Sequence, residues 1–128
     1  MKTEISTIFK KLQDQICLGL EKINTSSKFS EDLWERPGGG GGRSRTLSKG
    51  KFIQKGGVNF SEVSGPTPET ILKSLDLPLS DFYATGVSIV IHPVNPWVPI
   101  IHMNVRYFEI SDGTYWFGGG IDLTPHYV

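Results

Sequence analysis

Three consecutive segments decide the fold of this chain: FYATGVSIVIH at residues 82–92, IIHMNVRYFEI at 100–110 and TYWFGGGIDL at 114–123. Each segment is rich in β-branched and aromatic residues, which favour extended strands. Asp112 and Gly113, between the last two segments, are typical of a hairpin turn, so these two strands should pair antiparallel. The sequence therefore predicts an antiparallel sheet in the second half of the chain.

Side chains alternate between the two faces of a strand, so each segment can be sorted by residue parity. Within 100–110, one face is apolar and the other carries His102, Asn104 and Arg106. Asp122 shares a face with two of the glycines at 118–120, which leave room for a bulky group. A face that simply meets water is the alternative, but these residue types favour a ligand lying on the sheet.

The length of the hairpin loop determines whether Asp122 reaches this polar face. A two-residue loop would place Asp122 opposite Met103, on the apolar face. A three-residue loop, or a bulge within 118–120, would bring Asp122 to the side of His102 instead. We expect one of these two arrangements.

The rest of the chain completes a single domain over residues 1–128. Residues 4–24 have apolar side chains at three- and four-residue steps, which predicts an amphipathic helix that packs on the sheet. Residues 26–37 read as a polar connector and 34–47 as a loop rich in glycine and arginine. Strands are expected within 51–123, with short β-like segments at 51–55 and 57–63 and a helical turn at 68–75. The expected fold class is α+β.

Composition excludes several classes of protein. The 128 residues carry 13 Lys and Arg against 13 Asp and Glu, so bulk charge does not favour binding to nucleic acid or to a membrane. Cys17 is the single cysteine, which excludes an intrachain disulfide and suits packing in the helix. No apolar stretch approaches the ~18 residues of a membrane span, and no signal peptide is visible. A cytoplasmic protein is expected.

Eight of the 15 glycines fall in two runs, at 38–42 and 118–120. The first run superficially resembles a phosphate loop, but its spacing is too short and Arg43 stands where that motif has lysine. A flexible linker is a second interpretation. With Arg43 and Arg45 so close, we favour a mobile flap that offers backbone N–H groups and arginines to an anionic ligand.

Histidines raise the question of a metal. His92 and His102 lie on neighbouring predicted strands, but two imidazoles make an incomplete site, because open catalytic sites usually supply three ligands. The orientation of His126 cannot be read from the sequence. A divalent metal at His92 and His102 is therefore left open.

A resemblance to a known family is carried by four ordered segments: WERPGGGGGRSR (34–45), GGVNFSEVSG (56–65), GVSIVIHPVNPWVPIIHMNVRYFE (86–109) and WFGGGIDLTP (116–125). Together they are similar to the oxygen-dependent coproporphyrinogen III oxidases. These enzymes convert two propionates of coproporphyrinogen III to vinyl groups, with consumption of oxygen and release of carbon dioxide, and give protoporphyrinogen IX in haem biosynthesis. The resemblance implies a homodimer, an antiparallel sheet flanked by helices, and no organic cofactor.

The resemblance also assigns roles to individual residues. It implies a catalytic set, in which His102 is the proton donor, Asp122 meets the pyrrole N–H groups and Arg106 holds a propionate. It implies a substrate-binding set: Ser88, Asn104, Val105, Arg106, and Arg43 and Arg45 in the glycine-rich loop. His92 and His102 match positions that are sometimes assigned to a divalent cation in bacterial members of the family.

The chain departs from the family pattern in two ways. His126 and Tyr127 stand where the family commonly has two aromatic residues, so His126 receives no role. Family members are also considerably longer, so the chain is expected to be an N-terminal portion, either a fragment or a truncated gene product, with little turnover of its own. The alternative function is a non-catalytic module that binds a porphyrin or another anion.

Overall fold

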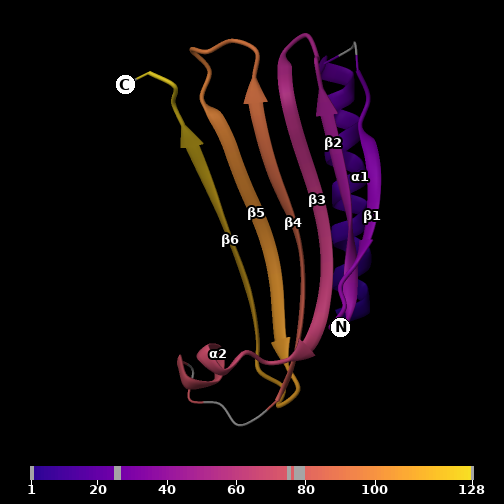
Figure 1. Cartoon of the computed structure of the whole chain (residues 1–128), viewed down its shortest axis with the longest axis vertical. Coiled ribbons are helices and arrows are strands. Elements are labelled where there is room, and N and C mark those ends of the chain that lie inside the picture. Colours follow the sequence, from indigo (N-terminus) through magenta and orange to yellow (C-terminus); the bar gives the residue numbers. More distant parts are fainter. Residues whose placement is uncertain (1, 25–26, 75, 77–79, 128) are drawn as a thin grey trace.

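The computed structural model describes residues 2–24, 27–74, 76 and 80–127, which form a six-stranded antiparallel sheet and two helices (Figure 1). In chain order the elements are α1 (Lys2–Asn24), β1 (Ser30–Glu35), β2 (Gly40–Ser48), β3 (Ile53–Pro66), α2 (Glu69–Ser74), β4 (Asp81–Pro93), β5 (Ile100–Ile110) and β6 (Tyr115–Thr124). The strands lie in the sheet in the order of the sequence. The α+β class is therefore confirmed. None of the helices in the described part could span a membrane.

The predicted elements of the second half are confirmed almost to the residue. β5 has the predicted bounds, and β4 and β6 differ from the prediction by one residue at each end. Helix α2 falls within the predicted turn at 68–75, of which Leu75 lies outside the described residues. The segments 51–55 and 57–63 contribute to one strand, β3, with an irregularity between Ile53 and Lys55.

The prediction of a connector and a loop over residues 26–47 was wrong, because much of this segment forms the β1–β2 hairpin. The two strands pair from Ser30 with Thr46 to Glu35 with Gly41. At the turn, the Arg36 N–H donates to the Gly40 carbonyl at 2.8 Å. Gly40 has φ +89°, a conformation that strains any residue with a side chain. The first glycine run thus supplies a tight turn and the start of a strand rather than a loop.

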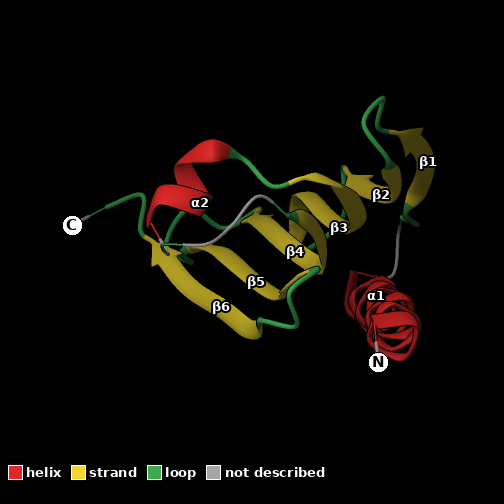
Figure 2. Ribbon diagram, turned by 90° about the horizontal axis from the view of Figure 1, so that it is seen from below, coloured by secondary structure: helices red, strands yellow, loops and turns green. Residues whose placement is uncertain are grey.

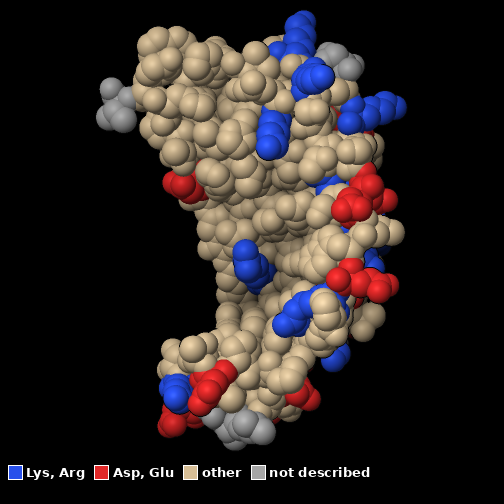
Figure 3. Space-filling model, viewed as in Figure 1, with Lys and Arg blue, Asp and Glu red and all other residues tan. Residues whose placement is uncertain are grey.

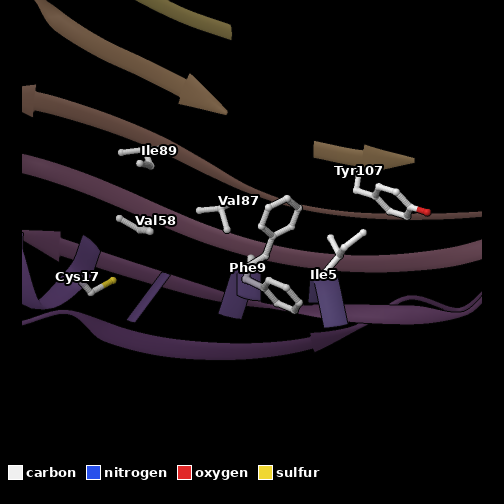
Figure 4. Close-up of a cluster of buried hydrophobic side chains, with 8 residues drawn as sticks. Ile5, Phe9, Cys17, Val58, Val87, Ile89 and Tyr107 are labelled. Atoms are coloured by element: carbon white, nitrogen blue, oxygen red, sulfur yellow. The ribbon is translucent and has the colours of Figure 1, made fainter. Parts of the chain in front are cut away.

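The core lies on one face of the sheet, under α1, whereas α2 lies on the other side (Figure 2). Ile5, Phe9 and Cys17 of α1 point toward the sheet (Figure 4). They pack on side chains of the three central strands: Val58, Phe60, Val87, Ile89 and Tyr107. Burial raises the pKa of the Cys17 thiol, which agrees with a packing role.

Gln13 fixes α1 to the sheet through hydrogen bonds. Its side chain is fully buried, and its amide Nε2 donates to the carbonyls of Arg43 at 2.6 Å and Val58 at 2.8 Å. Its Oε1 accepts a hydrogen bond from Arg43 Nε at 2.6 Å. One polar side chain therefore joins α1 to β2 and β3, and its polar groups would be costly to leave unpaired at this depth.

Ion pairs also join α1 to the β1–β2 hairpin. Asp14 on α1 accepts Arg43 Nη2 at 3.0 Å and Arg45 Nη1 at 2.8 Å, and Arg45 Nη2 also lies 3.1 Å from Glu31 on β1. Both arginine side chains are about four-fifths covered. The network ties the β1–β2 hairpin to the helix and neutralises both guanidinium groups.

Near the start of α1, a second polar contact joins Tyr83 to Glu62, whose carboxylate accepts the tyrosine hydroxyl. Burial and this hydrogen bond both raise the pKa of Tyr83 above its ordinary range. Burial acts to raise the pKa of Glu62 as well, but hydrogen bonds from Ser6 and Tyr83 and nearby lysines outweigh it, so the pKa is lowered. Glu62 is therefore held ionised and Tyr83 neutral.

Replacing Gln13 by alanine should lower the free energy of unfolding by about 2–3 kcal/mol, because two carbonyls and an arginine Nε lose their buried partner. Urea unfolding of the purified chain measures this. Gln15, exposed on the same helix, gives the matched control, and its alanine variant should stay within about 0.5 kcal/mol of the parent. Equal effects of the two substitutions would contradict the role given to Gln13.

Candidate functional site

The β5–β6 hairpin has the three-residue loop that the sequence left as one of two options. The Ile110 N–H donates to the Thr114 carbonyl at 2.8 Å, which leaves residues 111–113 as the loop, and Gly113 has φ +99°. The register runs without a shift from Glu109 opposite Tyr115 to the far end of both strands. Asp122 therefore lies opposite His102, on the polar face, as expected.

A pocket of about 740 Å³ lies on the face of the sheet that α1 does not cover. Its polar floor contains Ser88 on β4 together with Asn104 and Arg106 on β5. In register, Asn104 lies opposite Ser88, and Arg106 lies opposite Gly86. Figure 3 shows this face: its middle is hollowed, a basic side chain stands in the hollow, and acidic side chains lie toward the margins.

Glycines create the hollow. Gly42, Gly86 and Gly118 lie in one row across β2, β4 and β6. The ring of Trp34 lies on Gly42, where an added Cβ would come within 2.3 Å of ring atom Cζ2. The stem of Arg106 lies over Gly86, and Gly118 has open space above it. The pocket floor is thus bare backbone in places, with Trp34 as one wall.

Aromatic rings form the boundary at one end of the pocket. Phe108 stacks on Phe82 with ring centroids 5.7 Å apart, and on Trp116 with centroids 4.5 Å apart. Phe108 and Trp116 line the pocket, as do Val63 and Ala84 in the same row across the sheet. A flat ligand with an apolar body and polar substituents fits an apolar row beside a polar floor.

His102 and Asp122 form a pair across two strands beside the pocket. His102 Nδ1 lies 3.8 Å from Asp122 Oδ2, which is within ion-pair range but too long for a hydrogen bond. The Nδ1 atom is covered and has no hydrogen-bond partner among the described residues, although 44% of the imidazole side chain is exposed. Asp122 is 71% exposed, so its carboxylate can meet a ligand placed on this face.

Arg106 and Asn104 form a second pair within β5. Arg106 Nε donates to Asn104 Oδ1 at 3.3 Å, and the arginine is exposed on the pocket side. Arg106 has no acidic partner among the ion pairs of the described residues, in contrast to Arg43 and Arg45. Its guanidinium is therefore available for a carboxylate, which it can bind through two parallel hydrogen bonds.

Three residues of the predicted binding set lie elsewhere. Strand alternation turns the side chain of Val105 to the α1 face, where it packs against the core, so only its backbone is near the pocket. Alternation likewise gives the α1 face to Arg43 and Arg45, which pair with Asp14 there, while Gly42 and Ser44 take the pocket face. We therefore leave these three side chains out of the site.

The histidines do not complete a metal centre. His102 lies opposite Val90, so His92 is two residues further along β4 on the same face. Across the described ranges, no group of three or more His, Cys, Asp or Glu side chains could hold a metal ion. The donors present here are too few for the three-ligand site that open metal centres usually have.

The structure adds pocket residues that the sequence did not single out: Trp34, Ser44, Asn59 and Ser61. Asn59 and Ser61 alternate with the apolar Val58 and Phe60 in β3, and this alternation is the signal that could have placed them on the polar face. The sequence did not show that β4 lies beside β3, because their pairing links residues about 30 positions apart.

Fold and site together define an antiparallel sheet whose open face is suited to an anionic, partly apolar ligand. The family model for coproporphyrinogen III oxidase matches residues 4–128, so the chain belongs to the coproporphyrinogen III oxidase family. This confirms the resemblance drawn from the four segments.

Individual relatives of the chain carry the name of the same family. The chain is 53% identical over 118 residues to the oxygen-dependent coproporphyrinogen-III oxidase of Prochlorococcus marinus strain NATL1A, an alignment that covers 91% of this chain and 34% of the relative. It is 47% identical over 131 residues to the enzyme of the same name from Coxiella burnetii strain Dugway 5J108-111, covering 98% of the chain and 42% of the relative. The chain thus spans well under half the length of these relatives.

Gly42→Ala should destabilise the chain by about 1–3 kcal/mol and displace Trp34, because the new methyl group would overlap its ring and lie 2.6 Å from the Phe60 carbonyl oxygen. Gly118→Ala is the matched control on the same face, since nothing lies within 4 Å of its added Cβ. It should be neutral or slightly stabilising, as alanine is in most strands. Thermal unfolding followed by tryptophan fluorescence compares the two variants, and a larger loss in Gly118→Ala would refute this packing.

Proposed function

We propose that the pocket face binds coproporphyrinogen III, and that this chain supplies residues for the oxidative decarboxylation of two of its propionates to vinyl groups. The product is protoporphyrinogen IX. The observation that carries the proposal is the sheet register, which aligns Ser88 with Asn104 and His102 with Asp122 around Arg106 on one open face. The names of the relatives, oxygen-dependent coproporphyrinogen-III oxidases, support the same reaction.

The reaction sets requirements that these side chains can meet. At each propionate, the bond to the carboxylate breaks and its electron pair forms the vinyl double bond as carbon dioxide leaves. A hydride equivalent leaves the carbon next to the pyrrole ring, and molecular oxygen, with one further proton, takes it up as hydrogen peroxide. The electron-rich pyrroles of the substrate supply the reactivity toward oxygen, so the protein must hold and orient the ring.

Each role follows from the chemistry of a side chain. Arg106, beside Asn104, binds a propionate carboxylate, and Ser88 adds a hydroxyl on the neighbouring strand. Asp122 accepts pyrrole N–H groups and offsets positive charge on the ring as electrons leave it. His102 donates the proton, and it lies opposite Asp122 with Nδ1 3.8 Å from Oδ2.

Further properties are proposed from the family resemblance. The active form is a homodimer, and molecular oxygen is the co-substrate without an organic cofactor. The chain corresponds to the N-terminal part of the longer relatives, and the rest of such a protein would supply the remaining walls of the site. Cytoplasmic placement stays a prediction from the sequence.

Arg106→Met should weaken the binding of coproporphyrin III, the stable oxidised form of the substrate, by about 10- to 100-fold. The loss follows from the charge-assisted hydrogen bonds that the guanidinium makes with a carboxylate, which are worth about 1.5–3 kcal/mol. Fluorescence titration of the purified chain measures the affinity. The reaction itself is assayed with a chimera of residues 1–128 followed by the remainder of the Coxiella relative, in which the same substitution should lower kcat/KM by at least about tenfold.

Arg45→Met is the control, because Arg45 lies on the α1 face and pairs with Asp14 and Glu31. This variant should lose stability but keep the affinity of the parent chain, with circular dichroism confirming that both variants fold. An unchanged affinity in Arg106→Met, or a loss confined to Arg45→Met, would rule out the proposed binding face.

A further inference from the structure

Two polar residues of β3 have no role in the site described so far. Asn59 lies opposite Ser88, and Ser61 lies opposite Gly86, so both face the pocket beside β4. On the other side of β4, Asn104 and Arg106 occupy the matching positions of β5. Two pairs of polar side chains thus flank a central strand that presents only a serine and a glycine between them.

The fold itself gives no reason for these residue types. Asparagine is depleted in β-strands, and Asn59 stands in the middle of the 14-residue strand β3. Neither its amide nor the Ser61 hydroxyl forms a hydrogen bond within the described part of the chain, and Asn59 is exposed to the pocket. Their donors are therefore free to bind a ligand in the pocket.

The spacing indicates which part of a ligand they meet. Adjacent strands are 4.7–4.9 Å apart, so β3 and β5 are separated by about 9–10 Å. One carboxylate cannot reach across this distance, whereas a tetrapyrrole with propionates around its ring can place one at each side. The Trp34 ring lies on Gly42, which is opposite Ser61 on the neighbouring strand. It forms an apolar wall of the pocket on the side of β3.

We propose that Asn59 and Ser61 form a second carboxylate subsite, which donates N–H and O–H hydrogen bonds to a propionate other than the one held by Arg106. This inference rests on the proposed function and extends it. The subsite favours ligands with several carboxylates around the ring, and it positions the macrocycle over Gly86 without taking part in the chemistry.

The isosteric substitution Asn59→Asp tests the proposal, because the second subsite predicts a lower affinity for coproporphyrin III and not a higher one. A carboxylate at position 59 repels a ligand carboxylate, so the affinity for coproporphyrin III at pH 7.5 should fall by at least about tenfold, further than in Asn59→Ala. Binding should recover as the pH is lowered and the new aspartate is protonated, a response that a purely structural role would not produce. If Asn59 instead accepted a pyrrole N–H, Asn59→Asp would bind as tightly as the parent or more tightly.

Asn95→Asp is the matched control, because it makes the same change of charge in the β4–β5 loop, where the exposed Asn95 side chain accepts the Trp97 N–H. Its affinity should stay within about twofold of the parent. Unchanged or tighter binding by Asn59→Asp overturns the second subsite. If Arg106→Met still weakens binding in the same titration, the proposed function stands and only this inference fails, whereas a parent chain that binds no coproporphyrin overturns both.

Discussion

The three-residue loop at 111–113 decides which side chains of β6 share a face with those of β5. Adding or removing one residue there would turn every side chain of β6 to the opposite face, since alternation has a period of two. With this loop, Asp122 lies opposite His102, and Gly118 and Gly120 lie beside Arg106 and Asn104. The place of the carboxylate opposite the imidazole and the bare backbone next to the guanidinium both follow from this one loop length.

One face of the sheet carries the contacts that stabilise the fold, and the other face carries the pocket. Helix α1 covers one face through an apolar core, the buried Gln13 and the ion pairs of Asp14. This leaves the other face free to carry glycines, polar groups and an arginine that has no acidic partner among the described residues. Such groups would weaken a core but suit a binding surface. Stability on one side thus permits an open, polar site on the other.

Much of the fold and the centre of the site could be predicted from sequence because the signals are local. The alternation in β5 separated His102, Asn104 and Arg106 from the apolar side chains that pack in the core. Strand β1 was missed because all its residues are exposed, so it has no apolar pattern and depends on pairing with β2. Arg43 and Arg45 were misplaced because their partner Asp14 lies about 30 residues away, and no local signal shows that pairing.

The proposed function requires that a tetrapyrrole lies on the face that α1 leaves uncovered, and the three tryptophans test this requirement. Trp34 and Trp116 line the pocket, whereas Trp97 lies 78% exposed in the β4–β5 loop, beside Tyr127. In NMR spectra of the ¹⁵N-labelled chain, coproporphyrin III should shift the indole N–H signals of Trp34 and Trp116 by ring current and leave Trp97 in place. Shifts confined to Trp97, or no shift at Trp34 and Trp116 under saturating ligand, would show that the ligand does not lie on this face.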